Sequence, residues 1–262
     1  MKKVTLLLTA FITLTAFTGS FAQTAEEIVS TYIENIGGQE EWSKVKSMKA
    51  TGIGRQQGVD YPFTFTTLRD GRTLINIDLQ GRQFTVEAFD GETQWAMNFQ
   101  TQKPEASDSE TSLNYKNRSK DNMPDAFMNY KEKGYEIELL GEEDFDGTSC
   151  YKIKLTKTPM LVDGVEKENI ETYYFDKDNF VPIAMESVMM SGPASGATST
   201  TIFTDYQEEN GLYMPYSVVT KFNGQAMFEM VMKEVEFNVE VDESIFEMPE
   251  DTAAESTDTD KN

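Results

Sequence analysis

The sequence has no histidine, a single cysteine and few basic residues. Its 262 residues hold 23 Lys and Arg against 45 Asp and Glu, a formal net charge of −22. Without imidazole the chain cannot form a Ser-His or Cys-His nucleophile pair, a His-ligated zinc site or a His general base. The acidic surplus repels the phosphates of nucleic acids and of anionic lipids. These absences exclude the familiar hydrolase mechanisms and a nucleic-acid partner.

The single cysteine, Cys150, rules out an intramolecular disulfide. It lies in the stretch TSCYK at residues 148–152, with no histidine or basic helix terminus evident beside it to lower the pKa of its thiol. We therefore interpret Cys150 as a small strand residue. A reactive thiol is the alternative.

Residues 1–22 have the order of a secretory signal peptide. Lys2 and Lys3 precede an uncharged run, and Ser20 and Ala22 place small residues at the −3 and −1 positions of a cleavage site. A membrane anchor is the alternative, but the apolar run is short and rich in threonine. We expect export and cleavage after Ala22, which leaves 240 residues with a formal charge of −24.

Helices are predicted at the start and in the middle of the mature chain. Thr24 and Glu27 form a capping box, and Gly37 ends a first helix after Ile36. A short second helix is expected around residues 40–45. Polar residues 100–122 are expected to form a long loop that could act as a mobile lid. Residues 124–133 predict another helix, with proline at its first turn.

Strands account for most of the remaining sequence. From Met48 apolar residues alternate with polar ones, and turn pairs such as Asp70-Gly71, Gln80-Gly81 and Asp90-Gly91 recur at ten-residue intervals. The pattern resumes at Tyr135 and continues to about residue 246. Few helices and about ten strands, without βαβ alternation, predict one α+β domain over residues 23–249, dominated by a single antiparallel sheet. Residues 250–262 predict a disordered acidic tail.

An enzyme without histidine would depend on carboxylates. Acids cluster at Glu142-Glu143-Asp144 and at Asp176-Lys177-Asp178, and two of them could form a glycosidase pair. Most acids, however, fall in turns or at polar strand positions, where they are simply solvated. Calcium could use the same oxygen ligands, but no EF-hand order is present, nor is a GxGxxG or phosphate-binding loop. We therefore predict no enzyme activity, no cofactor and no metal site.

The strand at residues 226–235 (AMFEMVMKEV) is apolar on both faces. Such a strand is expected to be covered on both faces. Short helices can cover only one side of so large a sheet, so the other side must close as a barrel or face a ligand. Fourteen methionines suit a cavity for variable apolar shapes, although they could equally fill a core.

Short motifs along nearly all of the mature chain, each a turn plus a strand or helix, point to a family. They are GGQEEWSKVKS at 37–47, FDGETQW at 89–95, YKEKGY at 130–135, DGTSCYKI at 146–153, YYFD at 173–176, DY at 205–206, GLYMP at 211–215 and VEFNV at 235–239. Together they resemble LolA-like outer-membrane lipoprotein-sorting proteins.

The resemblance implies a strongly curved, half-open antiparallel β-barrel with helices over its concave side or opening. It also implies non-covalent carriage of lipid or lipoprotein acyl chains through the periplasm. The better-studied carriers hold a helical lid closed with an arginine on an early strand. Here Arg55, Arg69, Arg72 and Arg82 occur in that region without a matching motif, so the lid mechanism is not carried over.

The leading hypothesis is a monomeric periplasmic carrier for lipid acyl chains or lipoproteins, with envelope membrane proteins as further partners. At a charge of −24, docking to a membrane would need a basic partner or divalent ions. The alternatives are a non-catalytic binding or sensor module and a carboxylate-based hydrolase. Shared strand parity predicts the residues that line the lipid cavity: Phe63, Phe65, Trp95, Met97, Met185, Met189, Phe228, Met230 and Met232.

Overall fold

The computed structural model describes residues 23–192 and 194–250. The predicted signal peptide (1–22) lies outside the described residues, as does the predicted acidic tail apart from Glu250. Among the described helices, none is both long enough and apolar enough to cross a membrane.

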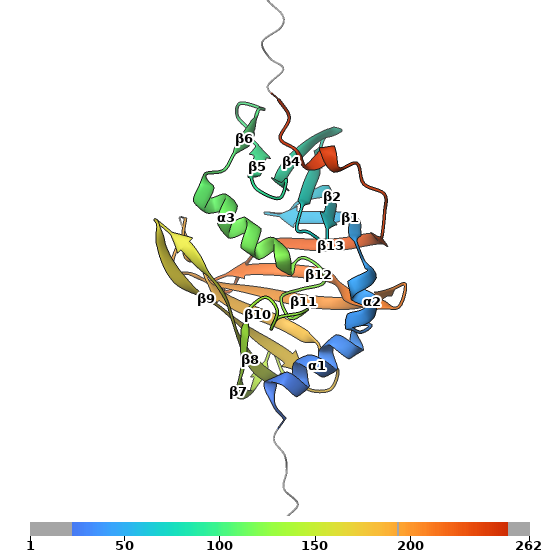
Figure 1. Cartoon of the computed structure of the whole chain (residues 1–262), viewed down its shortest axis with the longest axis vertical. Coiled ribbons are helices and arrows are strands. Elements are labelled where there is room, and N and C mark those ends of the chain that lie inside the picture. The colour runs from blue at the N-terminus through green and yellow to red at the C-terminus, as the bar shows by residue number, and fades with distance from the viewer. Residues whose placement is uncertain (1–22, 193, 251–262) are drawn as a thin grey trace, which may run out of the picture.

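One antiparallel sheet of thirteen strands forms the body of the molecule (Figure 1). It confirms the predicted fold class, with more strands than the ten expected. The strands are β1 (Ser47–Gln56), β2 (Val59–Leu68), β3 (Thr73–Leu79), β4 (Arg82–Phe89), β5 (Gln94–Met97), β6 (Pro104–Ala106), β7 (Glu136–Phe145), β8 (Thr148–Val162), β9 (Val165–Asp176), β10 (Pro182–Val188), β11 (Thr198–Glu209), β12 (Leu212–Phe222) and β13 (Gln225–Phe237).

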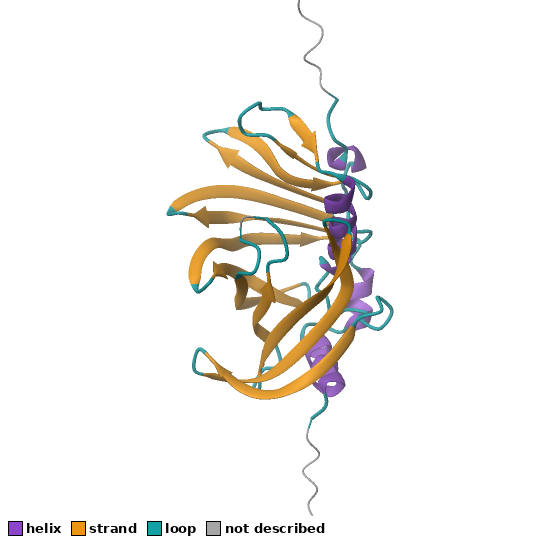
Figure 2. Ribbon diagram, turned by 90° about the vertical axis from the view of Figure 1, so that its left-hand side faces the viewer, coloured by secondary structure: helices purple, strands orange, loops and turns teal. Residues whose placement is uncertain are grey.

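The strand order places two consecutive strands at opposite edges of the sheet. β1 to β6 form one meander and β7 to β13 another, and the pairing of β1 with β13 joins them. The edges are therefore β6 and β7, and the sheet is unclosed. Residues 107–135 connect one edge to the other. This crossing segment lies on the side of the molecule along which Figure 2 shows the helices.

The first two helices lie within about a residue of the bounds that the sequence predicts. In α1 (Ala25–Asn35) the Thr24 hydroxyl accepts from the backbone N–H of Glu27, and the Glu27 carboxylate accepts from the N–H of Thr24. This reciprocal capping box satisfies two N–H groups that the helix leaves unpaired. Gly37 and Gly38 take φ values of 112° and 86°, which only glycine adopts without strain. The chain can therefore reverse into α2 (Gln39–Lys44).

The crossing segment differs from its prediction. The expected loop at 100–122 contains β6, the helix α3 (Ser109–Arg118) and a 3₁₀ turn, η1 (Ser119–Asp121). The helix expected at 124–133 is a series of turns. α3 buries only Ser112 and Tyr115, so it has no apolar periodicity to find. Within residues 124–133 the Asp125 carboxylate accepts from the backbone N–H of Phe127, two residues further on. This local turn competes with a helix.

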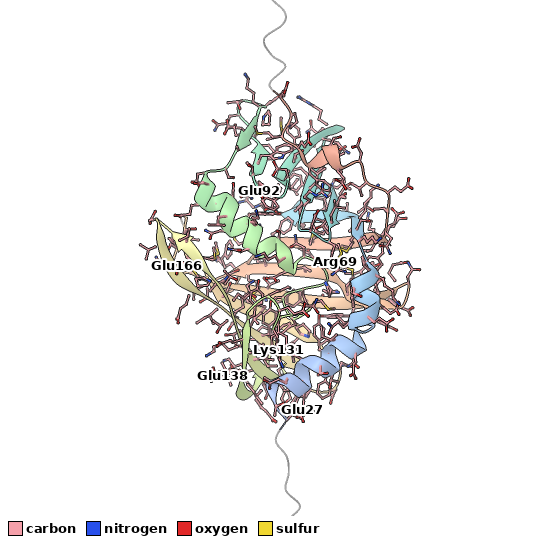
Figure 3. All side chains as sticks on the ribbon, viewed as in Figure 1. Glu27, Arg69, Glu92, Lys131, Glu138 and Glu166 are labelled. Carbon is pink, nitrogen blue, oxygen red and sulfur yellow. The ribbon has the colours of Figure 1, made fainter. Side chains whose placement is uncertain are left out.

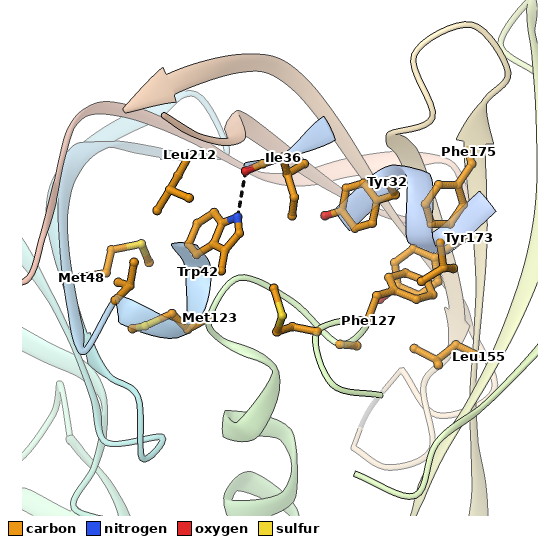
Figure 4. Close-up of a cluster of buried hydrophobic side chains, with 14 of the residues drawn as sticks. Tyr32, Ile36, Trp42, Met48, Met123, Phe127, Leu155, Tyr173, Phe175 and Leu212 are labelled. Atoms are coloured by element: carbon orange, nitrogen blue, oxygen red, sulfur yellow. Dashed lines mark hydrogen bonds between the residues drawn. The ribbon is translucent and has the colours of Figure 1, made fainter. Parts of the chain in front are cut away.

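The main core lies between the sheet and the helical segments (Figure 4). Trp42 of α2 is fully buried, and its indole N–H donates to the Ile36 carbonyl at 2.9 Å. Phe127 of the crossing segment packs edge-to-face against Phe175 of β9 and Tyr32 of α1. We call the face of the sheet that meets these residues the inner face. The core therefore fixes both the two N-terminal helices and the crossing segment on that face.

Arg69, in the turn after β2, ties three segments together (Figure 3 shows it beside α2). Its guanidinium donates to the carbonyls of Val45 at 2.8 Å and Met123 at 2.9 Å, and to that of Trp42. The planar fork of arginine can reach several acceptors at once. A single side chain thus joins the sheet, the C-terminal end of α2 and the crossing segment.

We predict that Arg69→Lys destabilises the protein by about 1–3 kcal/mol, because lysine keeps the charge but cannot reach all three carbonyls. Urea unfolding measures the change. The control is Arg82→Lys, since Arg82 donates to a single side-chain partner, Gln102. Equal losses in the two variants would show that the three carbonyl bonds contribute no more than the single contact of Arg82 with Gln102.

Candidate functional site

The inner face carries an apolar pocket of about 650 Å³ over β1 to β4 and β13. Its size falls in the range of small-molecule sites in proteins. Phe99 and Phe228 are 54% and 40% exposed, so the pocket opens to solvent beside them. The lining comprises Gly54, Gln56, Tyr61, Phe63, Phe65, Ile75, Ile77, Leu79, Val86, Glu87, Phe99, Phe228 and Met230.

Two glycines of β1 allow aromatic rings of the neighbouring strands to pack directly over the strand. Gly52 pairs with Phe63 and Met232, and Gly54 pairs with Tyr61 and Met230. A Cβ on Gly52 would lie 2.8 Å from the Phe63 ring, and one on Gly54 would lie 3.1 Å from the Phe228 ring. The central strand therefore presents bare backbone to the inner face, and the larger side chains of its neighbours occupy the space above it.

A β-bulge in β4 decides which residues face the pocket. Ile75 pairs with Glu87 while the adjacent Asn76 pairs with Thr85, so Val86 is an extra residue. A bulge re-aims the side chains that follow it. Val86 and Glu87 consequently both line the pocket, although they are consecutive.

Four of the nine residues predicted to line a cavity are in this pocket: Phe63, Phe65, Phe228 and Met230. Met232 is a buried member of the main core, and Met185 packs against that core. Met189 follows the end of β10, where its backbone bonds with Gly196 and Ala197. The prediction that these side chains bind lipid stays a prediction.

Trp95 and Met97 do not share the face of the pocket. Beyond the β4 bulge Ala88 pairs with Leu74 and with Trp95, which places them on the outer face. There Trp95 and Met97 pack with Phe246 of the 3₁₀ helix η2 (Glu243–Phe246), and the indole N–H of Trp95 donates to the Phe246 carbonyl at 2.8 Å. Parity counted through β4 without its extra residue assigns these two to the wrong face.

The expectation that β13 is covered on both faces is also wrong for its outer face. Met227 is 37% exposed and Val231 is only half-buried. The inner-face side chains of the same strand line the pocket or enter the core. The apolar side chains of β13 are therefore covered on the inner face of the sheet and partly exposed on the outer face.

Several lining residues were not among those predicted from the sequence, of which Ile75, Ile77 and Leu79 are the plainest. They alternate with Asn76 and Asp78 along β3, a period-two signal that could have found them. Phe99 follows β5 in a turn, and its ring stacks on that of Phe84 at 5.6 Å. No periodicity predicts a residue placed by a turn.

A charged cluster lies on the inner face beneath the crossing segment. The Lys157 ammonium donates to Asp121 at 3.0 Å and to Glu171 at 2.7 Å, and Lys133 donates to Asp121 at 2.9 Å. Burial disfavours the charged form of Lys157, but the carboxylates of Glu171 and Asp121 outweigh it and raise the pKa of Lys157. In residues 23–192 and 194–250, no group of three acids or other ligating side chains is placed to hold a metal ion.

A separate buried acid, Asp125, sits against α1. Its carboxylate accepts from the Tyr32 hydroxyl and, at 2.8 Å, from the backbone N–H of Phe127. Burial raises the pKa of the Asp125 carboxyl, although its hydrogen bonds and the charge of Lys133 act in the opposite direction. Compared with water, the core therefore shifts the titration of this carboxyl to higher pH.

Solved structures resemble the chain over most of its length. A LolA superfamily protein from Nitrosomonas europaea has 15% identity and a TM-score of 0.54, covering 86% of this chain and 98% of its own. A domain named for outer membrane lipoprotein sorting, from Vibrio parahaemolyticus, has 14% identity and a TM-score of 0.53, covering 84% and 94%. The chain has a LolA-like fold. This confirms the resemblance noted in the sequence at the level of the fold.

Three further comparisons bear on this chain. A DUF1329 family protein from Desulfovibrio piger has 13% identity and a TM-score of 0.55, covering 85% of this chain and 96% of its own. A family model described as "Uncharacterized protein" matches residues 125–250, which include β7 to β13. No curated protein matches the sequence. At these identities the likeness concerns the fold alone.

We predict that Asp125→Asn changes the pH dependence of stability. A carboxyl whose folded pKa is raised stabilises the fold fully below its unfolded pKa of about 3.9, and this contribution is lost as pH rises through the folded value. The wild type should therefore lose stability relative to Asp125→Asn as pH rises from 4 to 7. Urea unfolding across that range measures the difference. The exposed Asp144→Asn serves as control, and a parallel course of wild type and Asp125→Asn would contradict the prediction.

Proposed function

We propose that this LolA-like chain is an exported, non-enzymatic carrier that binds lipid or lipoprotein acyl chains in its inner-face pocket. The observation that carries the proposal is the open apolar pocket of about 650 Å³ over Gly54. Each methylene group buried there is worth about 0.8 kcal/mol. A chain of ten or more carbons could thus be held without a catalytic group.

The fold and the surroundings of the pocket favour a carrier over the alternatives. A binding or sensor module of the same shape would be expected to have a filled interior. A carboxylate hydrolase would need two acids free to act in a cleft, whereas Asp121 and Glu171 share the Lys157 ammonium. One similar structure is named for outer membrane lipoprotein sorting, which agrees with acyl chains as cargo and with a periplasmic location.

The charge of the protein bears on how a carrier would meet a membrane. With −24 on the mature chain, a bare anionic surface repels it. We infer that delivery depends on a basic partner protein or on divalent ions. Mass spectrometry of lipids that copurify with the exported protein tests whether acyl chains are its cargo.

We predict that Ile77→Glu weakens binding of the fluorescent fatty acid 11-(dansylamino)undecanoic acid by at least about tenfold. When the probe binds, a carboxylate on β3 would lose its water in the apolar pocket, and the acyl chain of the probe offers it no hydrogen-bond partner in exchange. Fluorescence titration of the full mature chain measures the affinity, and circular dichroism verifies folding.

The matched control is Val165→Glu, which makes the same change at a 59% exposed site in the β8–β9 hairpin, outside the pocket lining. It should bind the probe as the wild type does. Unchanged binding by Ile77→Glu, or no binding by the wild type, would overturn the proposed function.

A further inference from the structure

A second, polar pocket of about 340 Å³ lies between α3 and the strands β8 and β9. Uncharged hydrogen-bonding side chains make up most of its lining, and Met160 is the aliphatic member. The lining comprises Glu87, Gln94, Thr111, Asn114, Tyr115, Asn117, Arg118, Tyr135, Lys157, Thr158, Met160, Asn169, Glu171 and Ser191. Such a surface offers both donors and acceptors to a ligand.

The charged groups of the polar pocket are paired with one another. The Glu87 carboxylate accepts from the Tyr115 hydroxyl at 2.8 Å and from the Arg118 guanidinium at 3.1 Å. Lys157 is held between Asp121 and Glu171, at 3.0 and 2.7 Å. Each cation that lines the pocket thus already has a carboxylate partner, and the charges of the lining balance.

Glu87 connects the polar pocket with the apolar one, because its side chain lines both. The β4 bulge turns Glu87 to the inner face opposite Ile75. One molecule with an apolar tail and a polar head could therefore occupy the two pockets together, with its head group beyond Glu87.

The polar pocket owes its character to α3, which crosses the inner side of the sheet in Figure 1. Polar contacts hold α3 against the β8–β9 hairpin. The Asn114 amide exchanges two hydrogen bonds with the backbone of Leu161. The Glu110 carboxylate accepts from the backbone N–H groups of Asp163 and Gly164. The side chains that α3 contributes to the pocket all carry hydrogen-bonding groups, which gives this side of the pocket its polar lining.

We propose that the pocket beneath α3 binds the uncharged polyhydroxyl head group of an amphiphile whose acyl chain lies in the apolar pocket. Hydroxyl groups both donate and accept, as the amides and hydroxyls of the lining do. A phosphate head would meet the carboxylates of Glu87 and Glu171, whose cationic neighbours are already engaged. This inference rests on the proposed carrier function and names the class of cargo.

The test compares ligands that share one tail and differ in the head. Decyl maltoside and decyl phosphate are titrated into the full mature chain by calorimetry, each below its micelle-forming concentration. A salt concentration of about 0.3 M screens the overall negative charge of the protein. We expect decyl maltoside to bind at least about tenfold more tightly than decyl phosphate.

Two variants place the preference in the polar pocket. Asn117→Leu on α3 and Asn169→Leu on β9 each remove one hydrogen-bonding lining residue and should lower the preference for maltoside at least about threefold. Ser109→Leu is the control, because it makes a similar change at an exposed position of α3 outside the lining. Thermal unfolding verifies that each variant is folded.

The outcomes separate this inference from the carrier function. Equal or tighter binding of decyl phosphate, or a preference that both Asn variants leave intact, overturns the polyhydroxyl site while tail binding still stands. If neither ligand binds the wild type, the carrier function is overturned and the head-group site with it.

Discussion

The pairing of β1 with β13 is the constraint on which the rest of the molecule depends. It joins two meanders into one sheet and so makes β6 and β7, consecutive along the chain, the two edges. The connection between them packs on the inner face of the sheet. Because the N-terminal helices pack on that same face, a space enclosed between sheet and helices follows from the topology.

The composition of the crossing segment then divides that space. Its C-terminal part carries Met123 and Phe127, which pack with Trp42 and Tyr32 and fill one end. Its N-terminal part is the polar helix α3, which spans the other end without filling it. A filled core, an apolar pocket and a polar pocket therefore share one face. Arg69 stabilises the arrangement by bonding to both α2 and Met123.

The features that could be predicted from the sequence are those that a few neighbouring residues determine. The capping box of Thr24 and the turn glycines are local, and they located α1 and the hairpins correctly. The alternation along β2 and β13 is also a local signal, and it correctly placed Phe63 and Phe228 in the lining of one pocket. The bulge at Val86 leaves no mark in the alternation of its own strand, so the faces of Trp95 and Met97 were reversed. α3 was missed because it buries only Ser112 and Tyr115, too few residues to give an apolar period.

Stability alone does not explain the charges beneath the crossing segment. Replacing a buried ion pair with apolar side chains is often neutral or stabilising, and the rest of the inner face shows that this sheet accommodates such residues. In a chain with nearly twice as many acids as bases, Lys133 and Lys157 are nonetheless matched there against Asp121 and Glu171. The acidic surplus must then lie elsewhere, where water solvates it. A balanced, hydrogen-bonding interior beside an apolar one is what an amphiphile with an uncharged head requires.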